Sequence, residues 1–279
     1  MLVSLKEILS YAEEKNCAIG SFNTPNLENI NAVLAAAEEL GTPVILSHAE
    51  IHEAVSPIRT IGPVMVALAE KANVPVCVHL DHCEHLEYME KALDLGFGGV
   101  MYDGSVLPYE ENLENTLKAV ALAAKYGAGV EAEIGKMAAR EGGECDTGPV
   151  YTEPSTALAF AQASGIDALA PSFGTSHGIY RAKPQLDICL VEKIRDITGL
   201  PLVMHGGSGV SEEDYQQAIT AGIRKINYYS YMAKVGASAV ESYLHTNGVP
   251  FFHDLALTAE LAMKADSAKA MRVFMCAKG

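Results

Sequence analysis

The sequence has no long apolar run and no basic amino terminus. No segment approaches the roughly 18 consecutive apolar residues that a membrane-spanning helix needs. Residues 1–7, Met-Leu-Val-Ser-Leu-Lys-Glu, lack the basic start and the apolar stretch of a signal peptide. We therefore expect a cytoplasmic protein.

Clustered cysteine is absent as well. The 6 cysteines form no Cys-x-x-Cys pair and are scattered over Cys17, Cys77, Cys83, Cys145, Cys189 and Cys276. A disulfide framework or a zinc ribbon requires a regular, closer spacing. The pattern argues against both, and we expect most of these thiols to be reduced.

Positive charge is scarce. The 20 Lys and Arg residues against 35 Asp and Glu residues give a formal net charge of -15 at pH 7. Nucleic acids and anionic membranes require a basic surface, so we expect neither as a partner. An anionic small-molecule substrate remains compatible with this charge if a metal ion or helix amino termini supply positive potential locally.

The sequence does contain a regular alternation of strand-like and helix-like stretches, in a composition typical of soluble globular proteins, 49% hydrophobic and 20% charged. Strands are predicted at 18–23, 43–49, 74–81, 98–103, 129–135, 168–173, 200–205 and 223–228. Helices are predicted at 26–40, 58–72, 86–95, 110–126, from 154 onward, at 185–198, between 211 and 222, and after 228. A polar, glycine-containing loop is predicted at 136–151.

Eight strand–helix units in 279 residues match an α/β fold, the single (β/α)8 or TIM barrel. No Pro/Gly/Ser-rich linker marks a boundary, so residues 1–279 are predicted to form one domain. A doubly wound open sheet is the alternative.

Three of the predicted strands lead into a histidine. His82 follows Asp81 at the end of Val-Cys-Val-His-Leu-Asp-His, and His177 and His205 are each followed by a glycine. The carboxyl ends of all barrel strands meet on one face, so these imidazoles would converge. Three imidazoles with an open fourth position form a catalytic zinc site. The alternative is three unrelated histidines at loop starts.

The other histidines near these strands are assigned structural positions. His79 lies two residues before Asp81, so it should point to the same side and pack one layer deeper. His48 and His52 are assigned to a loop, because no third ligand is evident near them.

A glycine-rich turn follows the seventh predicted strand. Gly206-Gly207-Ser208-Gly209 directly precedes the helix predicted from Ser211, whose free N–H groups and dipole suit a phosphate. Barrels often bind phosphate at the loops after strands seven and eight. A tight turn without a ligand is the alternative.

Six motifs in this order resemble a known family. They are His-Leu-Asp-His at 79–82, Met-Tyr-Asp-Gly-Ser at 101–105, Glu-Ala-Glu-Ile-Gly at 131–135, Gly-Thr-Ser-His-Gly at 174–178, His-Gly-Gly-Ser-Gly at 205–209 and Lys-Ile-Asn at 225–227. Together they cover nearly the whole chain and resemble the class II, zinc-dependent ketose-bisphosphate aldolases. The resemblance implies a TIM-barrel lyase of carbohydrate metabolism. Such an enzyme reversibly cleaves fructose or tagatose 1,6-bisphosphate to dihydroxyacetone phosphate and glyceraldehyde 3-phosphate.

The resemblance also implies roles for individual residues. The zinc ligands would be His82, His177 and His205. Asp81 would take the C4 hydroxyl proton, and Glu141, in the 136–151 loop, would protonate the intermediate. The remaining implied residues are Asp103 and Glu133 near the metal or at a second cation, and Asn23, Gly178, Gly206, Gly207, Ser208, Asn227, Tyr228, Tyr229 and Ser230 at the substrate. A monovalent cation (Na+ or K+) and a homodimer or homotetramer are implied too.

Elementary chemistry agrees with this assignment. Breaking the C3–C4 bond leaves negative charge on an enediolate, where a Lewis acid is useful. A class I aldolase would need a lysine nucleophile, and the sixth strand carries none. Lys225 has the strand parity of Asn227 but lies deeper, so we expect it to pair with Glu131 or Glu133.

Several positions depart from the family pattern. Tyr229 is bulky where the family has a small or acidic residue, Ala49 replaces a frequent hydroxyl, and Ala138-Ala139 replaces a Gly-Gly pair. Arg181 could contact an anion or face solvent. These departures leave open an aldolase of the same mechanism whose aldehyde half is deoxy, acidic or unphosphorylated. A zinc hydrolase and a non-catalytic sugar-phosphate sensor are further alternatives. The hydrolase would need a His-x-His on the first strand, which this sequence lacks. The sensor would not need Asp81, which is present.

Overall fold

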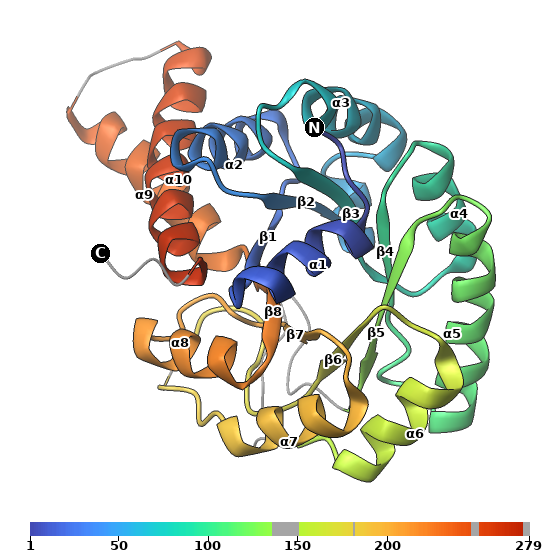
Figure 1. The fold of residues 1–279 in the computed structure, drawn as a ribbon. Helices are drawn as coiled ribbons and strands as arrows, with labels where there is room; N and C mark the ends of the chain where they lie inside the picture. Colours follow the sequence, from blue (N-terminus) through green and yellow to red (C-terminus); the bar gives the residue numbers. More distant parts are fainter. Residues whose placement is uncertain (136–150, 181, 247–250, 276–279) are drawn as a thin grey trace.

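A computed structural model describes residues 1–135, 151–180, 182–246 and 251–275 (Figure 1). Its eight strands are parallel and pair in sequence order, and β8 pairs with β1 to close the barrel. The strands are β1 (Ile19–Asn23), β2 (Val44–Ala49), β3 (Val76–Cys83), β4 (Gly99–Tyr102), β5 (Gly129–Ile134), β6 (Ala168–Pro171), β7 (Leu202–Met204) and β8 (Ile223–Tyr228). The predicted (β/α)8 barrel is confirmed, and the open-sheet alternative is wrong.

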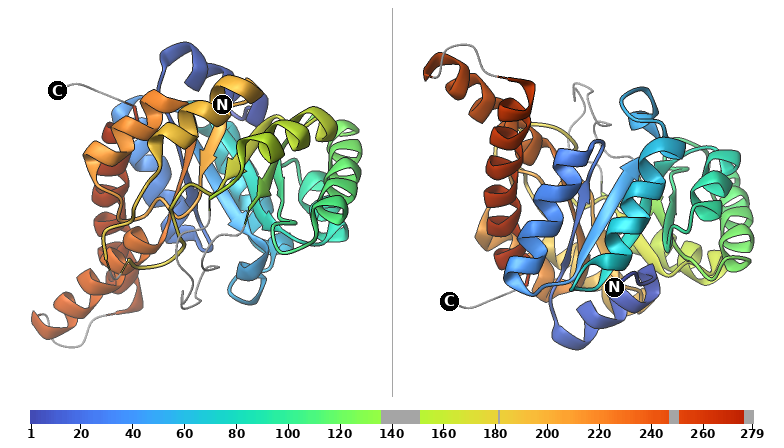
Figure 2. Two further views of the ribbon diagram at one scale, coloured as in Figure 1. Left: turned by 90° about the horizontal axis from the view of Figure 1, so that it is seen from below. Right: turned by 90° about the horizontal axis from the view of Figure 1, so that it is seen from above.

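Most of the helices pack around the outside of this barrel (Figures 1 and 2). They are α1 (Leu5–Lys15), α2 (Leu27–Leu40), the 3-10 helix η1 (Glu50–Ala54), α3 (Ile58–Lys71), α4 (Leu86–Asp94), α5 (Tyr109–Ala124), α6 (Pro154–Ser164), α7 (Ile188–Thr198), α8 (Glu212–Ala221), α9 (Ser230–Thr246) and α10 (Phe252–Phe274). The boundaries follow local chemistry. Pro154 opens α6, where its missing N–H is harmless, and the Ser211 hydroxyl caps α8. Gly222 follows α8 with a φ of 123°.

Helix α1 was not predicted from the sequence. Its signal is a capping box, in which the Ser4 hydroxyl accepts from the Glu7 N–H and the Glu7 carboxylate accepts from the Ser4 N–H. The apolar face of α1, including Leu5 and Leu9, packs in a buried cluster with Ile19 and Ile45 of the strands. α1 therefore closes the amino-terminal end of the barrel and leaves the carboxyl-terminal end for the site (Figure 1).

A second, larger apolar cluster fills the layer between the strands and the surrounding helices. Residues of alternate parity point into it from each strand, such as Val76, Val78 and Leu80 of β3. The positions of β3 that alternate with these point into the barrel, and toward the carboxyl end of the strand they carry polar groups, His79 and Asp81. The barrel interior is thus polar toward its carboxyl-terminal end, where side chains can do chemistry.

The carboxyl-terminal helices extend beyond the barrel. Figure 2 shows α9 and the start of α10 projecting from its side, while the rest of α10 packs against α2. Large apolar side chains exposed along this projection are Leu244, Phe251, Phe252, Leu257 and Leu261. Within the described residues, we find no helix whose length and apolar character would let it cross a membrane.

Candidate active site

Asp81 and His82 both face the open end of the barrel, although adjacent strand residues normally point to opposite sides. His82 has a φ of 43°, in the left-handed region that few residues other than glycine adopt. The β3–β4 register also shifts between Leu80 and Cys83. This local irregularity turns His82 inward beside Asp81, and such strained backbone is often found at functional sites.

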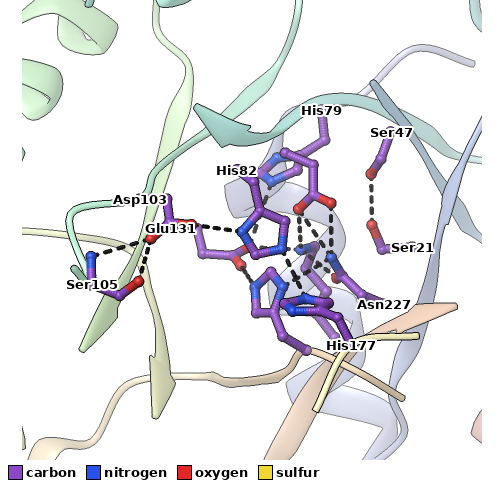
Figure 3. Close-up of polar contacts among 12 residues, drawn as sticks. Ser21, Ser47, His79, His82, Asp103, Ser105, Glu131, His177 and Asn227 are labelled. Carbon is purple, nitrogen blue, oxygen red and sulfur yellow. Dashed lines mark hydrogen bonds and ion pairs between the residues drawn. The ribbon is translucent and has the colours of Figure 1, made fainter. Parts of the chain in front are cut away.

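The three strand-end histidines lie together (Figure 3). The Nε2 atoms of His82 and His177 are 3.1 Å apart, and the ring centroids of His82 and His205 are 4.5 Å apart. Each of the three offers a ring nitrogen, and these nitrogens lie within 4.8 Å of one another. The barrel thus gathers onto one point three imidazoles that come from β3 and from the segments after β6 and β7.

Two carboxylates adjoin these imidazoles. His82 Nδ1 is 2.9 Å from Asp103 Oδ2, and the other Asp103 oxygen accepts from the Ser105 hydroxyl at 2.6 Å. His82, Asp103 and Glu133 form a second group of possible ligands. Burial would lower the pKa of His82, but the charges of Asp81 and Asp103 raise it to about 10. The pocket therefore strongly favours positive charge at His82.

Glu133 provides a test of whether a metal fits. Its Oε2 has no hydrogen-bond partner among the described residues, and burial, followed by the charge of Asp103, raises its pKa well above the usual range. A buried carboxylate oxygen without a partner is costly unless a cation approaches it. Imidazoles and carboxylates are ligands for zinc and similar divalent ions, so these residues fit such an ion.

Asp81 is fully buried and held by one amide. Asn227 Nδ2 donates to Asp81 Oδ1 at 2.9 Å and to Oδ2 at 3.1 Å. Burial alone would raise the pKa of Asp81, but the positive charges of His82 and Lys225 lower it well below its usual range. Asp81 is therefore an ionised carboxylate that can accept a proton.

Next to the imidazoles lies a small pocket between the β6, β7 and β8 ends and β1. Its lining residues are Asn23, His177, Gly178, Gly206, Ser208, Asn227, Tyr228, Tyr229 and Ser230. All were predicted as metal or substrate residues, whereas Gly207, also predicted, lies outside the lining and donates its N–H to the Asn227 carbonyl at 3.1 Å. Gly206 has a φ of 62°, and a Cβ there would overlap the backbone oxygen of Ser176. This turn therefore needs glycine.

The helix whose first residue lines this pocket is α9, which begins within the predicted substrate segment 227–230. The sequence favoured the start of α8, but the Ser211 hydroxyl already accepts the Asp214 N–H there, and no α8 residue lines the pocket. Ser230, the first residue of α9, lines it instead. Because a helix amino terminus attracts anions, α9 supplies the positive end that suits a phosphate.

Sequence reasoning missed two contributors to this region. The Tyr180 hydroxyl accepts from the Ser176 N–H at 2.9 Å and donates to the Gly206 carbonyl at 2.8 Å, so it ties the two glycine-containing loops together. The ring of His52 lies 5.3 Å from that of Tyr229. No sequence motif marks Tyr180, and His52 was assigned to a loop although it lies in η1.

The remaining predictions about buried groups can be compared directly. His79 is fully buried, as predicted, and Lys225 pairs with Glu131 at 2.8 Å, the first of its two predicted partners. The loop assignment of His48 is wrong, because it lies within β2 and its Nε2 is 3.1 Å from the Tyr88 hydroxyl. Glu141, Ala138-Ala139 and Arg181 lie outside the described residues.

Comparisons with known proteins agree with this geometry. The sequence matches the family described as "Fructose-bisphosphate aldolase class-II" over residues 3–279. It is 42% identical over 229 residues to a fructose-bisphosphate aldolase of Geobacillus stearothermophilus, covering 81% of this chain and 80% of that protein. It is 39% identical over 249 residues to a fructose-bisphosphate aldolase of Staphylococcus aureus (strain Mu50 / ATCC 700699), covering 88% and 87%. The crystal structure of the YdjI aldolase from Escherichia coli K12 superposes with a TM-score of 0.88 at 34% identity, over 98% of this chain and 97% of that one.

Proposed function

Because the chain belongs to the class II fructose-bisphosphate aldolase family, and is therefore a lyase, we propose that it uses zinc to cleave a ketose 1,6-bisphosphate reversibly. The substrate would be of the fructose or tagatose type, and the products dihydroxyacetone phosphate and an aldehyde such as glyceraldehyde 3-phosphate. The observation that carries this proposal is the convergence of three imidazoles beside the buried, ionised Asp81.

In this proposal His82, His177 and His205 hold the zinc ion, with Asp103 and Glu133 supporting it or accepting a second cation. When bound, the ion would supply Lewis-acid stabilisation of the charge that develops as the C3–C4 bond breaks. The imidazole and carboxylate donor set supports zinc over calcium or magnesium, which prefer oxygen ligands.

Asp81 is proposed to accept the C4 hydroxyl proton during cleavage. The two hydrogen bonds from Asn227 fix the Asp81 carboxylate in one orientation, which is the requirement for a positioned base. In the reverse direction Asp81 would return this proton to the new hydroxyl. Glu141 is proposed to protonate the enediolate carbon.

The phosphate of the dihydroxyacetone half is proposed to bind at the turn Gly206 to Ser208 and the start of α9. Ser208, Tyr229 and Ser230 line that pocket, and Gly178 and Asn23 complete its walls. The α9 amino terminus presents the positive end of the helix dipole to an anion. Holding one end of the ketose here would direct its C3–C4 bond toward Asp81.

A second candidate keeps the cleavage and changes the aldehyde half, which would be deoxy, acidic or unphosphorylated. Ala49 favours it, because its Cα pairs with that of Asp81 across the β2–β3 ladder and its side chain offers no hydroxyl to the substrate. The contact of Tyr229 with His52 also changes the wall of the pocket from the family pattern. The two candidates differ in preferred ketose and share the bond that breaks.

Further properties are proposed on the same basis. Residues 1–279 would act as a single barrel domain in the cytoplasm, with Na+ or K+ assisting turnover. The exposed apolar residues of the α9–α10 projection support a homodimer or homotetramer, since monomers rarely expose large contiguous apolar patches.

The test is release of dihydroxyacetone phosphate by the zinc-loaded protein. Fructose 1,6-bisphosphate, tagatose 1,6-bisphosphate and fructose 1-phosphate would be compared, with chelator-treated protein and Asp81→Ala as controls. We expect cleavage that both controls abolish. Preference for a 1-phosphate would favour the second candidate, and no release from any ketose phosphate by zinc-loaded protein would contradict both.

A further inference from the structure

A buried lysine lies beneath the site and connects its parts. Lys225, on β8, is fully buried, and its ammonium group crosses the barrel interior to Glu131 on β5 at 2.8 Å. The same ammonium donates to Asn227 Oδ1 at 2.7 Å and lies 4.0 Å from Asp81 Oδ1. Figure 3 shows Glu131 and Asn227 on the two sides of this interior cluster.

The contact with Glu131 leads to the metal ligands. Glu131 uses its other oxygen, Oε1, to bond His205 Nε2 at 2.7 Å. An ionised carboxylate only accepts hydrogen bonds, so the proton of this bond is on Nε2 of the imidazole. His205 is thereby held with its proton on Nε2 and its lone pair on Nδ1, the tautomer in which Nδ1 can bind a metal.

The contact with Asn227 leads to the proton acceptor. An ammonium group donates only, so the Asn227 atom facing Lys225 is its carbonyl oxygen. This leaves the amide NH2 facing Asp81, at 2.9 and 3.1 Å, and His205 Nδ1, at 3.2 Å. Lys225 therefore decides which way the Asn227 amide is turned, and through it how Asp81 is held.

The charges explain why an ammonium is needed at this point. Glu131 and Asp81 are both fully buried, and burial alone would raise the pKa of each, yet the charge of Lys225 contributes to lowering both. His79 also lies near, with Nε2 3.6 Å from Glu131, but burial, and then the charge of Lys225, lowers the pKa of His79 to about 3. Neutral His79 cannot replace the ammonium as a counter-ion.

We propose that Lys225 is a positioning residue that sets two groups at once, the metal-binding nitrogen of His205 through Glu131 and the orientation of Asp81 through Asn227. It acts through these neighbours and is not itself a catalytic residue. This inference rests on the proposed function, because it assumes a metal at His205 and a proton acceptor at Asp81.

The test compares Lys225→Met with Arg224→Met in the full chain. Arg224 immediately precedes Lys225 on β8 and is also buried, but it bonds Glu13 of α1 at 3.0 Å. It therefore matches Lys225 in charge and strand without contacting the site. Zinc affinity would be measured by competition with a fluorescent chelator, and the ligand geometry by the visible absorption of the Co2+-loaded protein. Folding would be checked by circular dichroism.

For Lys225→Met we expect about tenfold weaker zinc binding or more, an altered Co2+ spectrum, and a fall in kcat with KM nearly unchanged. Arg224→Met should keep the zinc affinity and the Co2+ spectrum of the wild type. The double variant Lys225→Met/Glu131→Gln removes both charges and keeps an acceptor for His205. It should regain zinc affinity while kcat stays low, because the Asn227 amide is still not fixed.

The double variant also covers the case in which Lys225→Met does not fold, because it leaves no unpaired charge on Glu131. The inference would be overturned if Lys225→Met kept the wild-type zinc affinity and Co2+ spectrum. If only the double variant folds, it would be overturned by wild-type zinc affinity and Co2+ spectrum together with an unchanged kcat. A wild-type protein that binds zinc but cleaves no ketose phosphate would contradict the proposed function alone, because the metal-binding readout for Lys225 does not depend on turnover.

Discussion

The Nε2 atoms of His82 and His177 face each other at 3.1 Å although 95 residues separate them in the chain. A single proton can bridge two such nitrogens, but Asp81, Asp103 and Glu133 also surround His82 with carboxylates. The His82–His177 pair is therefore arranged for a cation of higher charge than a single proton.

Removal of the metal should lower the melting temperature. A ligand that binds only the folded state adds about 4 kcal/mol to the free energy of unfolding at about 1,000 times its Kd. We expect chelator treatment to lower Tm by several degrees and added zinc to restore it, measured by differential scanning calorimetry. His82→Ala should show no zinc-dependent change in Tm, whereas His85→Ala should respond like wild type, because His85 is exposed and bonds Glu50. An identical Tm with and without zinc in the wild type would contradict the metal site.

Asp81→Asn should separate metal binding from chemistry. Asparagine has nearly the shape of aspartate and can still bond Asn227, but it cannot accept the C4 hydroxyl proton. We expect kcat to fall by roughly 10²- to 10⁴-fold while the bound zinc remains at the wild-type ratio, measured by steady-state kinetics and metal analysis. Asp94→Asn is the control, because Asp94 accepts from the exposed Tyr126 hydroxyl far from the strand ends. Wild-type kcat in Asp81→Asn would remove its assigned role.

The sequence was sufficient for the strand order and for much of the interior. The apolar runs predicted β8 with its observed bounds. Strand parity predicted that Lys225 lies below Asn227 and pairs with Glu131 or Glu133, and the structure shows the pair with Glu131. Parity could not predict that His82 faces inward, because that depends on a left-handed residue and a register shift. Such features depend on the surrounding tertiary structure.

Two other differences have identifiable causes. The start of α8 matches a phosphate-binding pattern, yet no α8 residue lines the pocket, whereas the first residue of α9 does, because the loop after β8 leads directly into it. Helix α1 carried a local capping signal, Ser4 and Glu7, that went unused. The bracing of the glycine loops by Tyr180 had no local signal, because it joins two loops only after folding.

Gly206→Ala should damage the phosphate pocket by more than its backbone strain alone. Gly206 and Gly41 have nearly the same φ, 62° and 64°, so alanine at either costs about 1–2 kcal/mol in the left-handed region. A Cβ at Gly206 would overlap the Ser176 oxygen, whereas a Cβ at Gly41 meets nothing within 4 Å. We expect a lower free energy of unfolding in both variants, by a larger amount in Gly206→Ala, and a raised KM in Gly206→Ala only. Urea denaturation and kinetics would measure these effects, and equal losses with unchanged KM would contradict the assignment.

His48 should make stability depend on pH between its unfolded and folded pKa values. Burial, and then the nearby His52, lowers the pKa of His48 from 6.5 to about 4 in the folded state. The folded state favours the neutral ring, so the contribution of His48 to the free energy of unfolding is fully present above pH 6.5. This contribution is lost as pH falls toward 4, because the unfolded chain takes up the proton before the folded chain does. The upper limit of this loss is roughly 3 kcal/mol.

We expect His48→Gln to weaken this part of the pH dependence of Tm relative to wild type, because glutamine can also donate to the Tyr88 hydroxyl without titrating. His245→Gln changes an exposed histidine of α9 and should leave the wild-type pH dependence in place. The same slope of Tm against pH in His48→Gln and wild type would show that His48 does not titrate as described.

The α9–α10 projection should mediate self-association. Phe252 is 81% exposed, and Leu257 and Leu261, four residues apart, share one face of the same helix. Burying such a surface against a second copy would remove apolar area from water, whereas a charge at its centre would have to be desolvated. We expect Phe252→Glu together with Leu257→Glu to shift the protein toward monomer in sedimentation velocity, with the far-ultraviolet circular dichroism unchanged. Leu117→Glu places the same charge on the 45% exposed Leu117 of α5 and should leave the assembly intact. If the Phe252→Glu/Leu257→Glu variant sediments like wild type, self-association uses another surface. A monomeric wild type would contradict the proposed oligomer itself.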